Sequence, residues 1–106
     1  FTPAPVLKEV RGEYDEREGA LRVKYTFSTR ISEVDESRFL LYTRDGDWFD
    51  ADRLDDVQGD TVVLLYDLTR DEADELVLVV VDEGAVKGHR FMSGITNPPA
   101  SVPFRY

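Results

Sequence analysis

The sequence predicts an all-β fold, a β-sandwich of about seven short strands. Short apolar segments rich in Val, Leu, Phe and Tyr recur along the chain, and turn-forming residues separate them at regular intervals. No stretch keeps the apolar spacing of an amphipathic helix over about ten residues or more. The chain has 106 residues, which suits one domain with a two-layer core.

Residues 21–27 give the clearest strand signal. Leu21, Val23, Tyr25 and Phe27 alternate with polar residues along this segment. Because successive side chains of a strand point to opposite faces, this period of two is typical of a strand with one buried face.

Uninterrupted apolar runs predict further strands over residues 39–42, 62–66 and 76–81. The last run, LVLVVV, is the strongest and predicts a central strand buried on both faces. The residues that we expect to hold the sheets together are Leu21, Val23, Tyr25, Phe27, Leu64, Leu78 and Val80.

The two ends of the chain predict two further strands. Residues 6–10 follow a proline-rich opening, and residues 101–106 alternate apolar with polar side chains around Pro103. Since proline donates no backbone hydrogen bond, that segment belongs at an edge or a strand start. Residues 89–95 are a weaker strand candidate, and residues 71–75 predict one helical turn or a loop.

The composition excludes several classes of partner and chemistry. With 22 acidic and 13 basic residues the net charge is −9, which disfavours binding to nucleic acid or to anionic membranes. The absence of cysteine excludes disulfides, thiol chemistry and Cys-based zinc sites. The longest apolar run is too short to span a bilayer. The chain begins with Phe1, so we expect a module or processed subunit of a larger exported assembly.

The segment DGDWFDAD concentrates carboxylates and suggests a calcium site formed by Asp45, Asp47, Asp50 and Asp52. Its spacing does not match an EF-hand loop, because Phe49 occupies a ligand position. We therefore favour solvated turn residues over an ion site. A second acidic candidate combines two loops that could converge, and its residues are Asp35, Glu36, Asp82 and Glu83.

Trp48 and Phe49 in the same segment, together with Tyr42, are candidate ring platforms for a glycan or contacts for a protein partner. Adjacent residues of an extended segment point to opposite sides, so only one of Trp48 and Phe49 can face the core.

The terminal aromatic residues Phe1, Phe104 and Tyr106 are candidate partner contacts. Terminal strands that carry them could dock on a neighbouring module or subunit by strand-edge pairing. The alternative, which we favour, is that these segments complete the domain's own sheets.

No motif in the sequence names a reaction. His89 is the single histidine, and it could form a hydrolase triad only with Ser93 and a distant Asp. No nucleophile elbow surrounds any serine, and no glycine-rich phosphate loop is present. We therefore expect a protein that is not an enzyme and that needs no cofactor, calcium being the one candidate.

Several segments together resemble bacterial and archaeal Ig-like, fibronectin-III-like modules. They are YTFS at 25–28, DES at 35–37, FLL at 39–41, GDTVVLLYDL at 59–68 and DEGAVKG at 82–88. Modules of this kind are strung together in surface-layer, adhesin and secreted proteins of microbes. The resemblance implies an Ig-like or fibronectin-III-like β-sandwich with a structural or adhesive role.

These observations predict a non-catalytic spacer, assembly or adhesion module of a microbial cell-surface or secreted protein, located outside the cell. The expected partner is a protein, either a neighbouring module or another subunit. One alternative is a module that binds calcium or a glycan through the segment Asp45–Asp52. Another is an accessory domain of a virion or filament.

Overall fold

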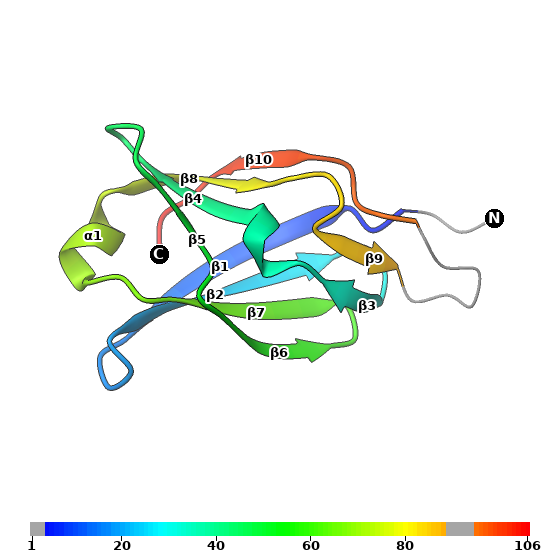
Figure 1. Cartoon of the computed structure of the whole chain (residues 1–106), viewed down its shortest axis with the longest axis horizontal. Coiled ribbons are helices and arrows are strands. Elements are labelled where there is room, and N and C mark those ends of the chain that lie inside the picture. The colour runs from blue at the N-terminus through cyan, green and yellow to red at the C-terminus, as the bar shows by residue number, and fades with distance from the viewer. Residues whose placement is uncertain (1–3, 89–94) are drawn as a thin grey trace.

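The computed structural model describes residues 4–88 and 95–106, and it has an all-β fold with antiparallel sheets, as predicted (Figure 1). The first sheet has the strand order β1-β2-β7-β6, and the second sheet has the order β10-β8-β4-β5. A small third sheet pairs β3 with β9.

The strand bounds of the first sheet are β1 Leu7–Asp15, β2 Ala20–Phe27, β7 Thr61–Tyr66 and β6 Arg53–Gln58. Those of the second sheet are β10 Ala100–Pro103, β8 Leu76–Val81, β4 Phe39–Thr43 and β5 Trp48–Asp50. The small sheet consists of β3 Ile31–Val34 and β9 Val86–Gly88. The helical elements are α1 Arg70–Asp74 and the 3₁₀ turn η1 Glu36–Arg38.

The first and second sheets share one core between their inner faces. In both sheets the side chains on one side of each strand point into this core, as the alternation within β2 predicts. The buried cluster consists of Leu21, Val23, Tyr25, Phe27, Ile31, Phe39, Leu41, Val62, Leu64, Tyr66, Leu68, Ala73, Leu76, Val79, Val81, Ala85, Val86 and Phe104.

Polar and aromatic contacts join the two sheets inside this core. The rings of Tyr25 and Phe39 lie 4.8 Å apart between centroids, in an edge-on arrangement. The Tyr66 hydroxyl donates to the Phe39 carbonyl at 3.1 Å, and the hydroxyls of Tyr25 and Tyr66 are hydrogen-bonded to each other. Burial raises the pKa of both tyrosines well above the ordinary value, so both stay neutral.

The prediction that residues 76–81 are buried on both faces is wrong. In β8, Val79 and Val81 face the core, whereas Leu78 and Val80 point outward and are only partly buried. The strand is interior to its sheet, but the described chain covers only one face of that sheet. A continuous apolar run does not distinguish an interior strand with one covered face from a strand covered on both faces.

Residues 71–75 were expected to form a helical turn or a loop; residues 71–74 lie in the short helix α1, and Glu75 is its C-cap. Thr69 and Glu72 form a reciprocal capping box at its N-terminus, which satisfies backbone N–H groups that a helix start leaves free. Ala73 packs into the core. In the described ranges, no helix is long and apolar enough to cross a membrane.

Four strands were not expected from the sequence: β3, β5, β6 and β9. β6 carries RLDDVQ, whose polar residues suit the exposed edge of a sheet. The others are only three or four residues long. The strand candidate over 89–95 falls mostly on residues 89–94, which lie outside the described residues.

Candidate functional site

Apolar side chains line the outer face of the second sheet across all four strands. In one cross-strand row, Trp48 pairs with Tyr42, Tyr42 with Leu78, and Leu78 with Pro103. In the next row Leu40 pairs with Val80. We call this surface the apolar face, and its residues are Leu40, Tyr42, Trp48, Leu78, Val80 and Pro103.

Alternation explains why these side chains point outward. In β4 and β8 the intervening residues Leu41 and Val79 are completely buried, so Leu40, Tyr42 and Leu78 must lie on the opposite side of the sheet. They keep partial contact with water. A partly accessible apolar cluster of this kind, with Trp48 and Pro103 exposed, is a candidate interaction surface on a protein with 33% charged residues.

Trp48 forms the edge of the apolar face and is its most exposed aromatic side chain, with 57% of its surface accessible. Its neighbour Phe49 packs against the core, which is the division that the alternation predicts. The Trp48 and Tyr42 pair therefore presents two neighbouring rings at one end of the face.

A tight hairpin sets the position of Trp48 opposite Tyr42. The Thr43 N–H donates to the Asp47 carbonyl at 2.8 Å, and the Asp47 N–H donates to the Thr43 hydroxyl at 3.1 Å. Gly46 has a φ of +91°, a conformation that residues with a Cβ rarely adopt. The turn chemistry in this acidic segment therefore aligns β5 on β4.

The structure does not gather the aspartates of this segment into an ion site. Within residues 4–88 and 95–106, no group of three or more His, Asp or Glu side chains is placed to hold a metal ion. Asp45 and Asp47 lie in the hairpin, whereas Asp50 ends β5. The Asp52 carboxylate accepts the Asp67 N–H at 2.6 Å, which ties the chain beyond β5 to the end of β7.

The second pair of acidic loops does converge, but around an arginine. The Asp35 N–H donates to the Ala85 carbonyl, and the Arg38 guanidinium donates to both the Asp35 carboxylate and the Glu83 carbonyl. The Asp35 carboxylate also accepts from the hydroxyl and N–H of Ser37, and these bonds, with Arg38, lower its pKa. Arg38 thus supplies the positive charge at this site.

The C-terminal aromatics serve the domain's own packing. Phe104 is only 6% exposed and fills the space left by Gly12, where an added Cβ would lie 2.5 Å from the ring. The Tyr106 hydroxyl donates to Asp74. Phe104 is therefore a core residue of this domain, while Phe1 lies outside the described residues.

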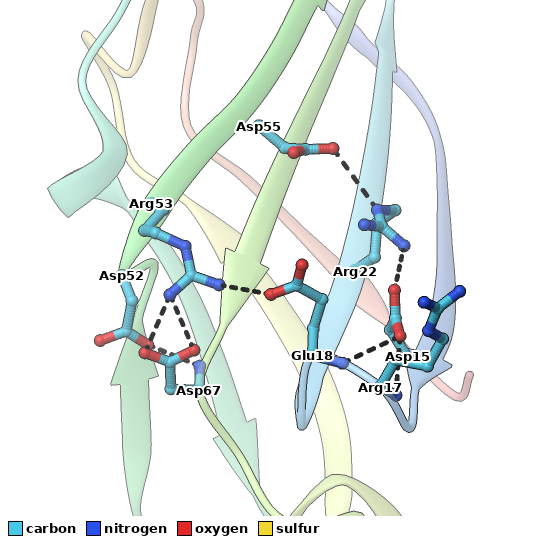
Figure 2. A network of polar contacts seen from close by, with 8 residues as sticks. All are labelled: Asp15, Arg17, Glu18, Arg22, Asp52, Arg53, Asp55 and Asp67. Atoms are coloured by element: carbon cyan, nitrogen blue, oxygen red, sulfur yellow. Dashed lines mark hydrogen bonds and ion pairs between the residues drawn. The ribbon is translucent and has the colours of Figure 1, made fainter.

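The outer face of the first sheet carries a network of ion pairs instead of an apolar surface (Figure 2). Arg22 contacts Asp15 at 3.0 Å and Asp55 at 3.4 Å. Arg53 contacts Asp67 at 3.2 Å and Glu18 at 3.7 Å. We call the outward surface of this sheet the charged face.

The Asp15 carboxylate is the most constrained acid of that network. It accepts the backbone N–H groups of Glu18 and Arg17 at 3.1 and 3.0 Å, in addition to the Arg22 guanidinium. The Glu18 N–H, followed by Arg22, lowers the pKa of Asp15 below its usual range. This carboxylate links the β1–β2 turn to the charged face.

The candidate catalytic pair does not enter the site, because His89 and Ser93 lie outside the described residues. The apolar face was missed because Leu78 and Val80 were assigned to the core. A signal for it is present in the sequence: two apolar runs, at 39–42 and 76–81, are longer than one buried face requires. Comparison with known proteins adds no relative, since no family model, no curated protein and no solved structure matches the chain.

Proposed function

We propose that the chain is a non-catalytic structural module of a microbial cell-surface or secreted protein, and that its apolar face packs against a neighbouring module of similar build. The observation that carries the proposal is the row Trp48, Tyr42, Leu78 and Pro103, which is apolar across the whole width of the second sheet. Burial of such a surface is the main driving force for association between domains.

The size of the apolar face favours a neighbouring domain over a freely diffusing partner. Four strands about 4.8 Å apart and two residue rows, the second flanked by Asp50 and Ser101, give a surface on the order of 300 Å². Two such surfaces would bury roughly 600 Å², the lower limit for contacts between domains of one chain and well below a stable interface between separate proteins. Tethering of the two partners would compensate for this small area.

The strand order supports an Ig-like arrangement. With the small β3–β9 pair set aside, the order β1-β2-β7-β6 corresponds to the A-B-E-D sheet of such domains, and β10-β8-β4-β5 extends their G-F-C sheet by one strand. Domains of this architecture are commonly strung together on cell surfaces, which is the basis for proposing an extracellular location.

The proposal can be tested with two copies of the chain joined by a long flexible Gly-Ser linker. Salt of about 0.5 M shortens the Debye length to a few ångströms and weakens the repulsion between two domains of charge −9. We expect the emission of Trp48 to shift to shorter wavelength relative to the single chain, and small-angle scattering to show a compact pair.

Leu78→Lys in both copies should abolish the compact pair, because it places a charge at the centre of the apolar face. Leu54→Lys is the matched control, since Leu54 is 41% exposed but lies on β6 at the edge of the first sheet. Two independently tumbling domains in the unmodified tandem protein would contradict the proposal, and so would equal effects of the two substitutions.

A second candidate function is glycan binding, which the exposed Trp48 beside Tyr42 favours because sugar rings stack on flat aromatic side chains. Trp48→Ala would abolish hits on a glycan array, whereas Leu54→Lys, on the first sheet, would leave them. An array without hits would exclude this alternative.

A further inference from the structure

A groove of about 640 Å³ follows the edge strand of the first sheet. Its base is formed by residues 9–13 of β1. The sheet forms one wall of the groove, with Lys24 of β2 and Val63 of β7. The C-terminal tail forms the other wall, with Arg105 and Tyr106. This groove belongs to the first sheet, and none of its residues is part of the apolar face.

The free edge of β1 borders the groove. In the part of the chain that the structure describes, β1 pairs only with β2, although it is nine residues long. The tail passes close to it, with Phe104 packed on Gly12, yet no backbone hydrogen bond joins residues 104–106 to β1. The outward N–H and C=O groups of β1 are therefore available to an added strand.

Cationic side chains outnumber acidic ones in the groove, whereas acidic residues outnumber basic ones in the whole chain. Four cationic and two acidic side chains line it, whereas the chain carries a net charge of −9. These side chains are Arg11, Arg22, Lys24 and Arg105, with Glu9 and Glu13.

Two of the four cations are already neutralised by the domain itself. The Arg11 guanidinium lies 3.1 Å from the Glu9 carboxylate, and Arg22 is held by Asp15 and Asp55 on the charged face. Lys24 and Arg105 differ, because neither makes an ion pair within 4 Å to any residue in the ranges 4–88 and 95–106. The groove thus has two cations, one on each side, that can attract an anionic ligand.

We propose that this groove binds an extended acidic segment of a partner protein, about five residues long, which adds to the free edge of β1 as a further strand. A strand advances about 3.4 Å per residue, so residues 9–13 offer a docking length of roughly 17 Å. Backbone hydrogen bonds to β1 supply affinity, and carboxylates facing Lys24 and Arg105 select an acidic sequence.

The test uses two blocked, labelled peptides of alternating sequence, Glu-Val-Glu-Val-Glu and Lys-Val-Lys-Val-Lys, at about 0.05 M salt, where surface charges are weakly screened. We expect the acidic peptide to bind at least about 10-fold more tightly than the basic one in fluorescence anisotropy. Strand addition also slows hydrogen exchange at amides within residues 9–13, which a loose electrostatic contact does not do.

The double variant Lys24→Glu, Arg105→Glu should weaken acidic-peptide binding at least about 10-fold. The matched control is Arg17→Glu, Arg30→Glu, which changes the net charge equally at exposed positions outside the groove. Equal weakening by both double variants, or binding without slower exchange at residues 9–13, would overturn the proposal.

Two further outcomes would also overturn it. Failure of both peptides to bind would mean that the charges of β1 serve only to protect a sheet edge from pairing. Tighter binding of single-stranded oligothymidylate than of the acidic peptide would assign the groove to polyanions in general. Leu78→Lys, which disrupts the apolar face, should leave acidic-peptide binding unchanged, so this test and that of the proposed function can fail independently.

Discussion

Leu65 and Leu78 are outward-facing leucines on interior strands, one in each sheet, and their surroundings differ. Leu65 pairs across the first sheet with Arg22 and Arg53, and only 5% of its surface is exposed. Leu78 pairs with Tyr42 and Pro103 and is only partly buried. Leu65 thus lies between two long arginine side chains across the strands and is buried, whereas the cross-strand neighbours of Leu78 are an aromatic ring and a proline, and Leu78 is only partly buried.

This difference separates a surface completed by the domain itself from one available to a partner. Figure 2 shows the guanidinium groups of Arg22 and Arg53 paired with carboxylates. An arginine side chain can keep such pairs while its aliphatic stem lies on an apolar neighbour, here the cross-strand partner Leu65. Such a surface gains little from further burial, because a partner would have to desolvate its charges. The apolar face incurs no such cost, which is why we assign it to module contacts.

The largest expected effect is a loss of stability when Leu65 is replaced by aspartate, and we compare it with the same replacement at Leu78. Leu65→Asp should lower the free energy of unfolding by about 3 kcal/mol or more, because it removes a buried apolar side chain and places a charge at a site that is only 5% exposed. Leu78→Asp should cost about 1 kcal/mol, since its site already contacts water. Urea denaturation followed by circular dichroism measures both values.

Leu65→Met is the control for the first of these variants, because a swap that nearly conserves volume should cost less than about 1.5 kcal/mol. If Leu65→Asp and Leu78→Asp destabilised the domain equally, the two faces would be equivalent and the comparison would fail.

The same two leucines show how far the sequence could predict the fold. Strict alternation in residues 21–27 predicted a half-buried strand, and β2 confirms it. Residues 76–81 predicted a strand in the right place but with both faces buried, because a run without polar residues carries no information about which face is covered. Consequently Leu78 and Val80 were expected in the core, where Val79 and Val81 lie.

Sequence reasoning found part of the candidate site. Trp48 was singled out as a partner or glycan contact, and it lies at the edge of the apolar face. Its relation to Leu78 and Pro103 could not be predicted, because it depends on the register between strands distant in sequence. The edge strand β6, with its acidic sequence, was missed for a different reason: exposed edges need no apolar pattern.

An intermediate effect is expected inside the core, where both sheets meet. The Tyr66 hydroxyl donates to the Phe39 carbonyl and is bonded to the Tyr25 hydroxyl. Tyr66→Phe leaves two buried partners unsatisfied and should cost about 2 kcal/mol, whereas Tyr25→Phe removes only one bond and should cost about 1 kcal/mol. Equal losses would show that the Phe39 carbonyl finds another donor. Thermal and urea unfolding of both variants give the comparison.

Alkaline pH tests the same pair in the unmodified protein. Folding raises the pKa of both tyrosines, so stability is complete below about pH 10 and falls as the unfolded chain ionises above that pH. The decline reaches at most about 1.4 kcal/mol per pH unit for each tyrosine. In the double variant Tyr25→Phe, Tyr66→Phe, the loss of stability that comes from these two tyrosines should disappear. An unchanged dependence of stability on pH would contradict the raised pKa of the buried pair.

The smallest expected effect separates the charge of Arg22 from its role as a cover. Arg22→Met keeps an unbranched apolar side chain over Leu65 and removes both ion pairs, so at low salt it should cost less than about 1 kcal/mol. Raising the salt to about 1 M should abolish that difference in stability, because the pairs are screened in the unmodified protein.

Arg22→Ala also removes the side chain beside Leu65. The further loss in free energy of unfolding relative to Arg22→Met should persist at high salt, as expected for a lost apolar contact. Equal losses of stability in both variants at both salt concentrations would contradict this role of Arg22. Leu65 would then be buried by the rest of the sheet, and the arginine would contribute only its ion pairs.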